Sequence, residues 1–145
     1  MGLFDIFKSK PQYSEMQVYA KAMAAAEAYK QRDFVRATKL FSDYFDMKGF
    51  GHFPQLDVHD YRMYLNLMLS QFYSKDYASC KKTCEKLISM RPSSGDAYAF
   101  SALCSFKLND RAEANRLWAT AKAKGNEMPV HFENIEDVRM DGFNI

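Results

Sequence analysis

Apolar side chains recur every three or four positions along most of this 145-residue chain, which is the spacing of amphipathic helices. The first such run opens with Ser14 followed by Gln17, the pattern of a capping box, and Tyr13 and Val18 occupy the positions of a hydrophobic staple. The run continues to Lys30. Strict alternation is rare and Val, Ile and Thr are sparse, which argues against a sheet. The pattern therefore predicts an all-α protein.

Three aspartates divide the rest of the pattern into helical hairpins. Asp33, Asp76 and Asp110 each stand just before an apolar-periodic segment, where a short carboxylate can cap exposed backbone N–H groups. Each follows another helical pattern by only a few residues. Because such short links force consecutive helices to pack antiparallel, we expect repeated helix–turn–helix units.

The three capped segments also align as an internal repeat. Their fifth positions are Ala37, Cys80 and Ala114. From 80 to 114 the interval is 34 residues, and from 37 to 80 it is 43, nine residues more. A period of 34 residues is that of a helical-hairpin repeat. The excess falls in the Gly- and Pro-containing stretch 48–57, which we interpret as an insertion.

On these residues the chain resembles the tetratricopeptide-repeat (TPR) family, with repeats at about 18–49, 61–94 and 95–126. Each second helix pairs a small residue with a bulkier one four positions later, in Ala37/Phe41, Cys80/Cys84 and Ala114/Trp118. Other matches to the family pattern are Pro92, Tyr64, Tyr98, Ala25 and Ala102, and departures from it are Met68, Gln71, Ser105 and Arg111. The resemblance implies antiparallel hairpins stacked as a short TPR-like solenoid, with capping segments at both ends.

The resemblance further implies a concave groove, lined by the first helix of each hairpin, that holds a partner protein or peptide. Its partner-binding residues would be Tyr19, Tyr29, Lys30, Arg62, Leu65, Leu69, Phe72, Tyr73, Leu103, Phe106 and Lys107, with Ala22, Ala26, Asp96 and Ala99 between them. Aromatic anchors with a few cations are the residue types that dominate binding energy. In the alternative interpretation, the tail or the N-terminal segment of the same chain fills this groove.

Three segments flank or interrupt the helical domain, which we place at 13–128. Residues 1–12 are amphipathic, and Leu3, Phe4 and Phe7 either contact a membrane surface weakly or cap the first repeat. In the insertion, Phe50, His52 and Phe53 either pack onto the domain or touch a partner. The tail 129–145 mixes apolar residues with four acids and Arg139, and we expect it to pack across the end of the array.

Composition excludes several classes of function. The formal net charge of +2 is too small to indicate nucleic-acid binding. No nucleotide-binding, protease or hydrolase motif occurs, and the three histidines have no metal-ligand spacing. Cys80, Cys84 and Cys104 lie inside apolar helical patterns, as buried thiols of a reducing compartment do. We therefore expect no enzyme activity, metal, cofactor or small-molecule substrate.

The sequence favours a cytoplasmic protein-binding module that acts as a chaperone or adaptor. No stretch approaches the ~20 apolar residues of a membrane span. One alternative is an inhibitory or immunity protein that neutralises a toxin or enzyme by covering its surface. A second is a scaffold held at the inner face of a membrane by residues 2–10.

Overall fold

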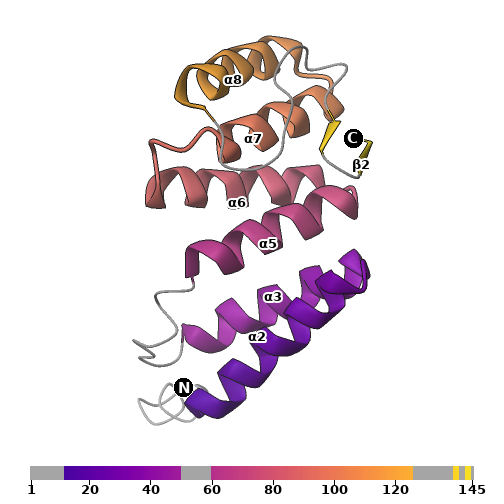
Figure 1. Cartoon of the computed structure of the whole chain (residues 1–145), viewed down its shortest axis with the longest axis vertical. Coiled ribbons are helices and arrows are strands. Elements are labelled where there is room, and N and C mark those ends of the chain that lie inside the picture. Colours follow the sequence, from indigo (N-terminus) through magenta and orange to yellow (C-terminus); the bar gives the residue numbers. More distant parts are fainter. Residues whose placement is uncertain (1–11, 50–59, 126–138, 141–142, 145) are drawn as a thin grey trace, which may run out of the picture. The chain divides into compact units, whose positions relative to one another are not determined.

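The computed structural model describes residues 12–49, 60–125, 139–140 and 143–144 (Figure 1). The helices in these ranges are α2 (Glu15–Lys30), α3 (Phe34–Lys48), α5 (Asp60–Tyr73), α6 (Tyr77–Met90), α7 (Asp96–Lys107) and α8 (Arg111–Lys124). Two short strands follow, β1 (Arg139–Met140) and β2 (Phe143–Asn144). The chain divides into two compact units, 1–70 and 71–145, and the division falls within α5. The all-α class and the helical hairpins predicted from the sequence are confirmed.

Helix α2 begins as its pattern predicts. The Ser14 side chain accepts a hydrogen bond from the Gln17 backbone N–H at 3.1 Å, and the Gln17 side chain accepts one from the Ser14 N–H at 2.8 Å. The capping box therefore forms at the start of α2, and Tyr13 packs against the cluster to which its predicted staple partner Val18 belongs.

The turn inside each hairpin has the same backbone geometry. Asp33, Asp76 and Asp110 each accept a hydrogen bond from the backbone N–H three residues later, at 3.2–3.3 Å. The residue before each aspartate has a positive φ of 63–65°, and these residues are Arg32, Lys75 and Asn109. Each aspartate N–H also donates to a carbonyl five residues earlier at 2.9 Å. A left-handed residue followed by a capping aspartate thus ends one helix and starts the next.

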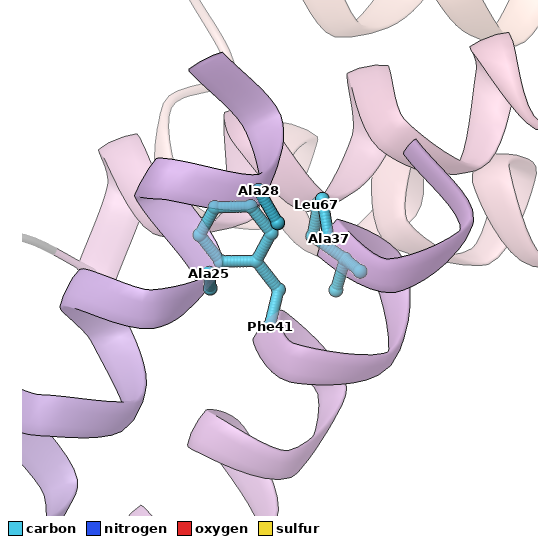
Figure 2. Close-up of a cluster of buried hydrophobic side chains, with 5 residues drawn as sticks. All are labelled: Ala25, Ala28, Ala37, Phe41 and Leu67. Atoms are coloured by element: carbon cyan, nitrogen blue, oxygen red, sulfur yellow. The ribbon is translucent and has the colours of Figure 1, made fainter. Parts of the chain in front are cut away.

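Small residues let the helices of the first unit approach closely. Ala25 and Ala28 of α2 meet Ala37 and Phe41 of α3, together with Leu67 of α5, in one buried cluster. Figure 2 shows the Phe41 ring directed toward the two alanines of α2. Ala37 and Phe41 are the small and bulky pair identified from the sequence, and both are fully buried. The pair packs in the core between α2 and α3.

The second unit is organised around α7, which packs against both α6 and α8 (Figure 1). Its residues 96–105 are all buried except Tyr98. Phe72, at the end of α5, makes edge-to-face ring contacts with Phe100 of α7 at 5.3 Å and with Tyr77 of α6 at 5.6 Å. The other small and bulky pairs, Cys80/Cys84 and Ala114/Trp118, are buried here as well.

Helix α7 begins in backbone contact with the end of α8. The Gly95 N–H donates to the Gly125 carbonyl at 2.8 Å. A Cβ at Gly95 would lie 2.2 Å from the Gly125 oxygen and 2.6 Å from the Ala121 oxygen. Only glycine leaves room for this approach, which closes the last hairpin.

The sequence pattern did not predict the two strands near the end of the chain. Strands β1 and β2 pair antiparallel, with Arg139 opposite Asn144 and Met140 opposite Phe143. Each strand has only two residues, too few for a period-two pattern to be visible. The signal that could have indicated them is the dipeptide Asp141-Gly142, which is favoured in two-residue hairpin loops.

Candidate functional site

A cavity of about 250 Å³ lies in the first unit, between helices α2, α3 and α5. Its lining residues are Tyr19, Ala22, Met23, Ala26, Tyr44, Arg62, Met63 and Asn66. Small-molecule sites usually enclose about 300–1,000 Å³. The smaller volume suits one or two protein side chains better than a metabolite.

The walls of the cavity combine adaptable apolar side chains with two polar groups. Tyr19 is 51% exposed and Met23 is 60% exposed, although both are large and apolar. Methionine side chains repack easily around different shapes. Arg62 and Asn66 stand one helical turn apart on α5, where they can bind a carboxylate and a peptide group. The cavity can therefore take an apolar side chain together with a nearby acid.

An ion pair connects the end of α3 to the start of α5, next to the cavity. The Lys48 Nζ donates to the Asp60 Oδ1 at 2.5 Å, and the Tyr44 hydroxyl donates to the same oxygen at 3.3 Å. Burial raises the pKa of Tyr44 to about 12; the charge of Lys48 opposes this rise and the charge of Asp60 adds to it. Tyr44 is therefore neutral at physiological pH, and its hydroxyl is held by Asp60.

The structure brings together part of the predicted groove. Tyr19 and Arg62 line the cavity, with Ala22 and Ala26 between them. Lys30 and Lys107 are exposed, and Tyr29, Leu65, Tyr73 and Phe106 are half-buried. The Phe106 ring lies 5.2 Å from the Arg111 guanidinium, and the Tyr29 ring lies 5.7 Å from that of Phe34.

Five predicted groove residues are buried: Leu69, Phe72, Asp96, Ala99 and Leu103. Phe72 is 4% exposed and belongs to the aromatic core of the second unit. A charged substitution at Phe72 would therefore test folding before it tested binding.

The predictions for the terminal segment and the insertion lie outside the described residues. They concern Leu3, Phe4 and Phe7 at one end and Phe50, His52 and Phe53 in the insertion.

Sequence reasoning missed four of the cavity residues: Met23, Tyr44, Met63 and Asn66. Two of them follow a predicted residue by one helical turn, Met23 after Tyr19 and Asn66 after Arg62. This spacing places them on the same helix face and could have identified them. Tyr44 comes from the second helix of its hairpin, which the groove prediction did not include.

The three cysteines lie in the core of the second unit. All three are buried, and none of them forms a disulfide. The hydrogen bond with Cys80 and then burial raise the pKa of Cys104. The hydrogen bond with Cys104 lowers the pKa of Cys80, but the bond with Cys84 and burial outweigh it, so this pKa is raised as well. Protonated, buried thiols are poor nucleophiles.

Within the described ranges, no group of three or more His, Cys, Asp or Glu side chains is arranged to hold a metal ion. The helices in those same ranges include none that is long and apolar enough to cross a bilayer.

No family model and no curated protein sequence matches the chain. Solved structures do match it. PcrH in complex with the chaperone binding region of PopB has a TM-score of 0.60 at 18% identity, over 77% of this chain and 83% of that one. PcrH from Pseudomonas aeruginosa has a TM-score of 0.61 at 18% identity, over 81% and 82% of the two chains.

A third similar structure is the TPR2B domain of yeast Sti1 in its pHsp70 complex. Its TM-score is 0.57 at 19% identity, over 75% of this chain and 80% of that one. Together these matches show that the chain has the fold of TPR-like helical repeat proteins, as its repeat pattern predicted.

Proposed function

We propose that this protein is a non-catalytic protein-binding module, of the chaperone or adaptor kind, that holds a segment of a partner protein against its first unit. The observation that carries the proposal is the cavity between α2, α3 and α5. Exposed tyrosine and methionine side chains border it. Each Å² of their apolar surface that a partner covers would stabilise the complex by about 25 cal/mol.

The structural matches support the same class of function. PcrH was solved with the chaperone binding region of PopB, and the Sti1 domain was solved in a pHsp70 complex. Both are helical repeat structures that hold a protein segment. The fold of this chain is the same, and its cavity offers aromatic and cationic side chains of the kinds found at binding hot spots.

The experiment is affinity capture from native cell extract with matched surface variants. Met23→Glu and Arg62→Glu alter the cavity. Val35→Glu and Arg36→Glu make the same changes of charge on α3, where Val35 is 74% exposed and Arg36 is exposed. A partner that binds in the cavity is retained by the wild type and the α3 variants and is lost with the cavity variants.

The captured partner is then purified and titrated against each variant by calorimetry. Equal affinity for the cavity variants and the α3 variants would contradict the proposal. The partner's own state decides between the alternatives. A partner bound through an extended apolar segment indicates a chaperone or adaptor. A folded toxin or enzyme that loses its activity in the complex indicates the inhibitory role.

A further inference from the structure

An exposed apolar stripe on α2 leads from the start of the helix to the cavity. Met16 is 82% exposed, Tyr19 is 51% exposed and Met23 is 60% exposed. Their spacing of three and four residues places them on one face of the helix. Tyr19 and Met23 also line the cavity, whereas Met16 lies in the first turn of α2. Three large apolar side chains in a row on one exposed helix face indicate a surface that another segment covers.

The charge among the described lining residues of the cavity is positive. Among its eight described lining residues, Arg62 is charged and none is acidic. A segment that fits the stripe and the cavity should therefore carry apolar side chains with one carboxylate among them.

The chain carries such a segment a few residues before the stripe in sequence. Residues 3–7 read Leu-Phe-Asp-Ile-Phe, four apolar side chains around one acid. Asp5 is the only acidic residue in positions 1–11. The segment thus matches both the apolar character of the surface and the single positive charge of Arg62.

The segment is also long enough to reach the cavity. Tyr19 and Met23 lie four and eight residues beyond Glu15, or about 6 and 12 Å along the helix axis. Residues 3–7 precede Gln12 by five to nine residues, which span up to about 17–30 Å when extended. A reversal of direction is needed near Pro11, a residue type that favours turns.

We propose that residues 3–7 dock in cis along Met16, Tyr19 and Met23, with their apolar side chains at the cavity and Asp5 paired with Arg62. The segment then occupies the site assigned to the partner and competes with it. It also keeps Leu3, Phe4 and Phe7 off a lipid surface. The proposal goes beyond partner binding, because cis docking can be measured on the full chain with no partner present.

Photo-crosslinking tests this directly. The full chain is made with p-benzoylphenylalanine in place of Phe4 and is irradiated alone. The benzophenone group inserts preferentially into C–H bonds of methionine. We expect a crosslink within one chain, to the tryptic peptide 22–30 that contains Met23 or to peptide 63–75 that contains Met63. Its yield should not depend on protein concentration.

Variants in this background separate docking from chance proximity. Arg62→Glu should lower the equilibrium constant for docking about fivefold, the factor that corresponds to ~1 kcal/mol for a partly exposed ion pair, and so lower the crosslink yield by up to that factor. Arg36→Glu, with the same change of charge on α3, should leave the yield unchanged. Circular dichroism confirms that each variant remains helical.

Three results would overturn the proposal. They are crosslinks that join two chains, crosslinks within one chain at sites away from the cavity, and crosslinks to lipid in place of protein when phosphatidylglycerol vesicles are added. Failure here would leave partner capture by the cavity intact, because that experiment depends on Met23 and Arg62 and not on Phe4.

Discussion

Replacing Gly95 with alanine should destabilise the second unit because the added methyl has no room. The Cβ would lie 2.2 Å from the Gly125 carbonyl oxygen, whereas ordinary contacts begin near 3.4 Å. The start of α7 and the end of α8 would have to separate by about 1 Å, which would break the 2.8 Å hydrogen bond between them. The φ of Gly95 is −79°, so alanine suffers no backbone strain of its own.

The magnitude follows from three terms. Overpacking costs about 1–3 kcal/mol. The lost hydrogen bond costs about 0.5–1.5 kcal/mol. The lower entropy of alanine in the unfolded chain offsets about 0.4–1 kcal/mol. We therefore expect the free energy of unfolding to fall by about 2 kcal/mol.

The assay is urea denaturation followed by the fluorescence of Trp118, which is buried in α8 and so reports on the second unit. Gly49→Ala is the matched control, because Gly49 is exposed and its added Cβ would meet no atom closer than 3.3 Å. A loss of under about 0.5 kcal/mol for Gly95→Ala, or a loss equal to that of the control, would refute the close approach of α7 and α8.

Three further predictions concern other parts of the described chain. In urea denaturation, Lys48→Met should lower the free energy of unfolding by about 1–3 kcal/mol, since it leaves the half-buried Asp60 carboxylate without its cation. The double variant Lys48→Met with Asp60→Leu should lose less stability than the sum of the two single variants. Lys75→Gly should stabilise the protein by about 0.5–1 kcal/mol in the same assay, because φ is 65° there, whereas Lys86→Gly inside α6 should destabilise it by about 1 kcal/mol. Stability should fall as pH rises above about 8.5, the thiol pKa of the unfolded chain, because raised pKa values keep Cys80 and Cys104 protonated in the folded state and unfolding then releases protons. The stabilising contribution of Tyr44, whose pKa is about 12, should be lost between about pH 10 and 12. In denaturation experiments at a series of pH values, Tyr44→Phe should flatten the decline in that range.

The hairpins were predictable from the sequence because their signals are local. Each capping aspartate acts on the backbone N–H three residues later, and the small and bulky pairs are four residues apart. The left-handed conformation before each aspartate was not predictable at Arg32 and Lys75, because neither residue type favours it, whereas asparagine, as at Asn109, does. What the three residues share is a positive φ, which is imposed by their position between the two helices of a hairpin.

The cavity was predictable only in part, because it depends on residues distant in sequence. Tyr44 reaches it from α3, and Lys48 binds Asp60 across the inserted stretch. The burial of Leu103 was not evident either. A helix that is buried along most of its length, as α7 is, shows no polar face that would distinguish core positions from groove positions.

The most direct test of partner binding is selection from a displayed library of random twelve-residue peptides on the immobilised full chain. Selected peptides are then titrated against the wild type, Met23→Glu and Val35→Glu. We expect enrichment of peptides with apolar residues around one acid. Their affinity should fall at least about tenfold with Met23→Glu, a loss of about 1.4 kcal/mol, and should be unchanged with Val35→Glu. Selected peptides that bind both variants equally well would contradict a binding site at the cavity.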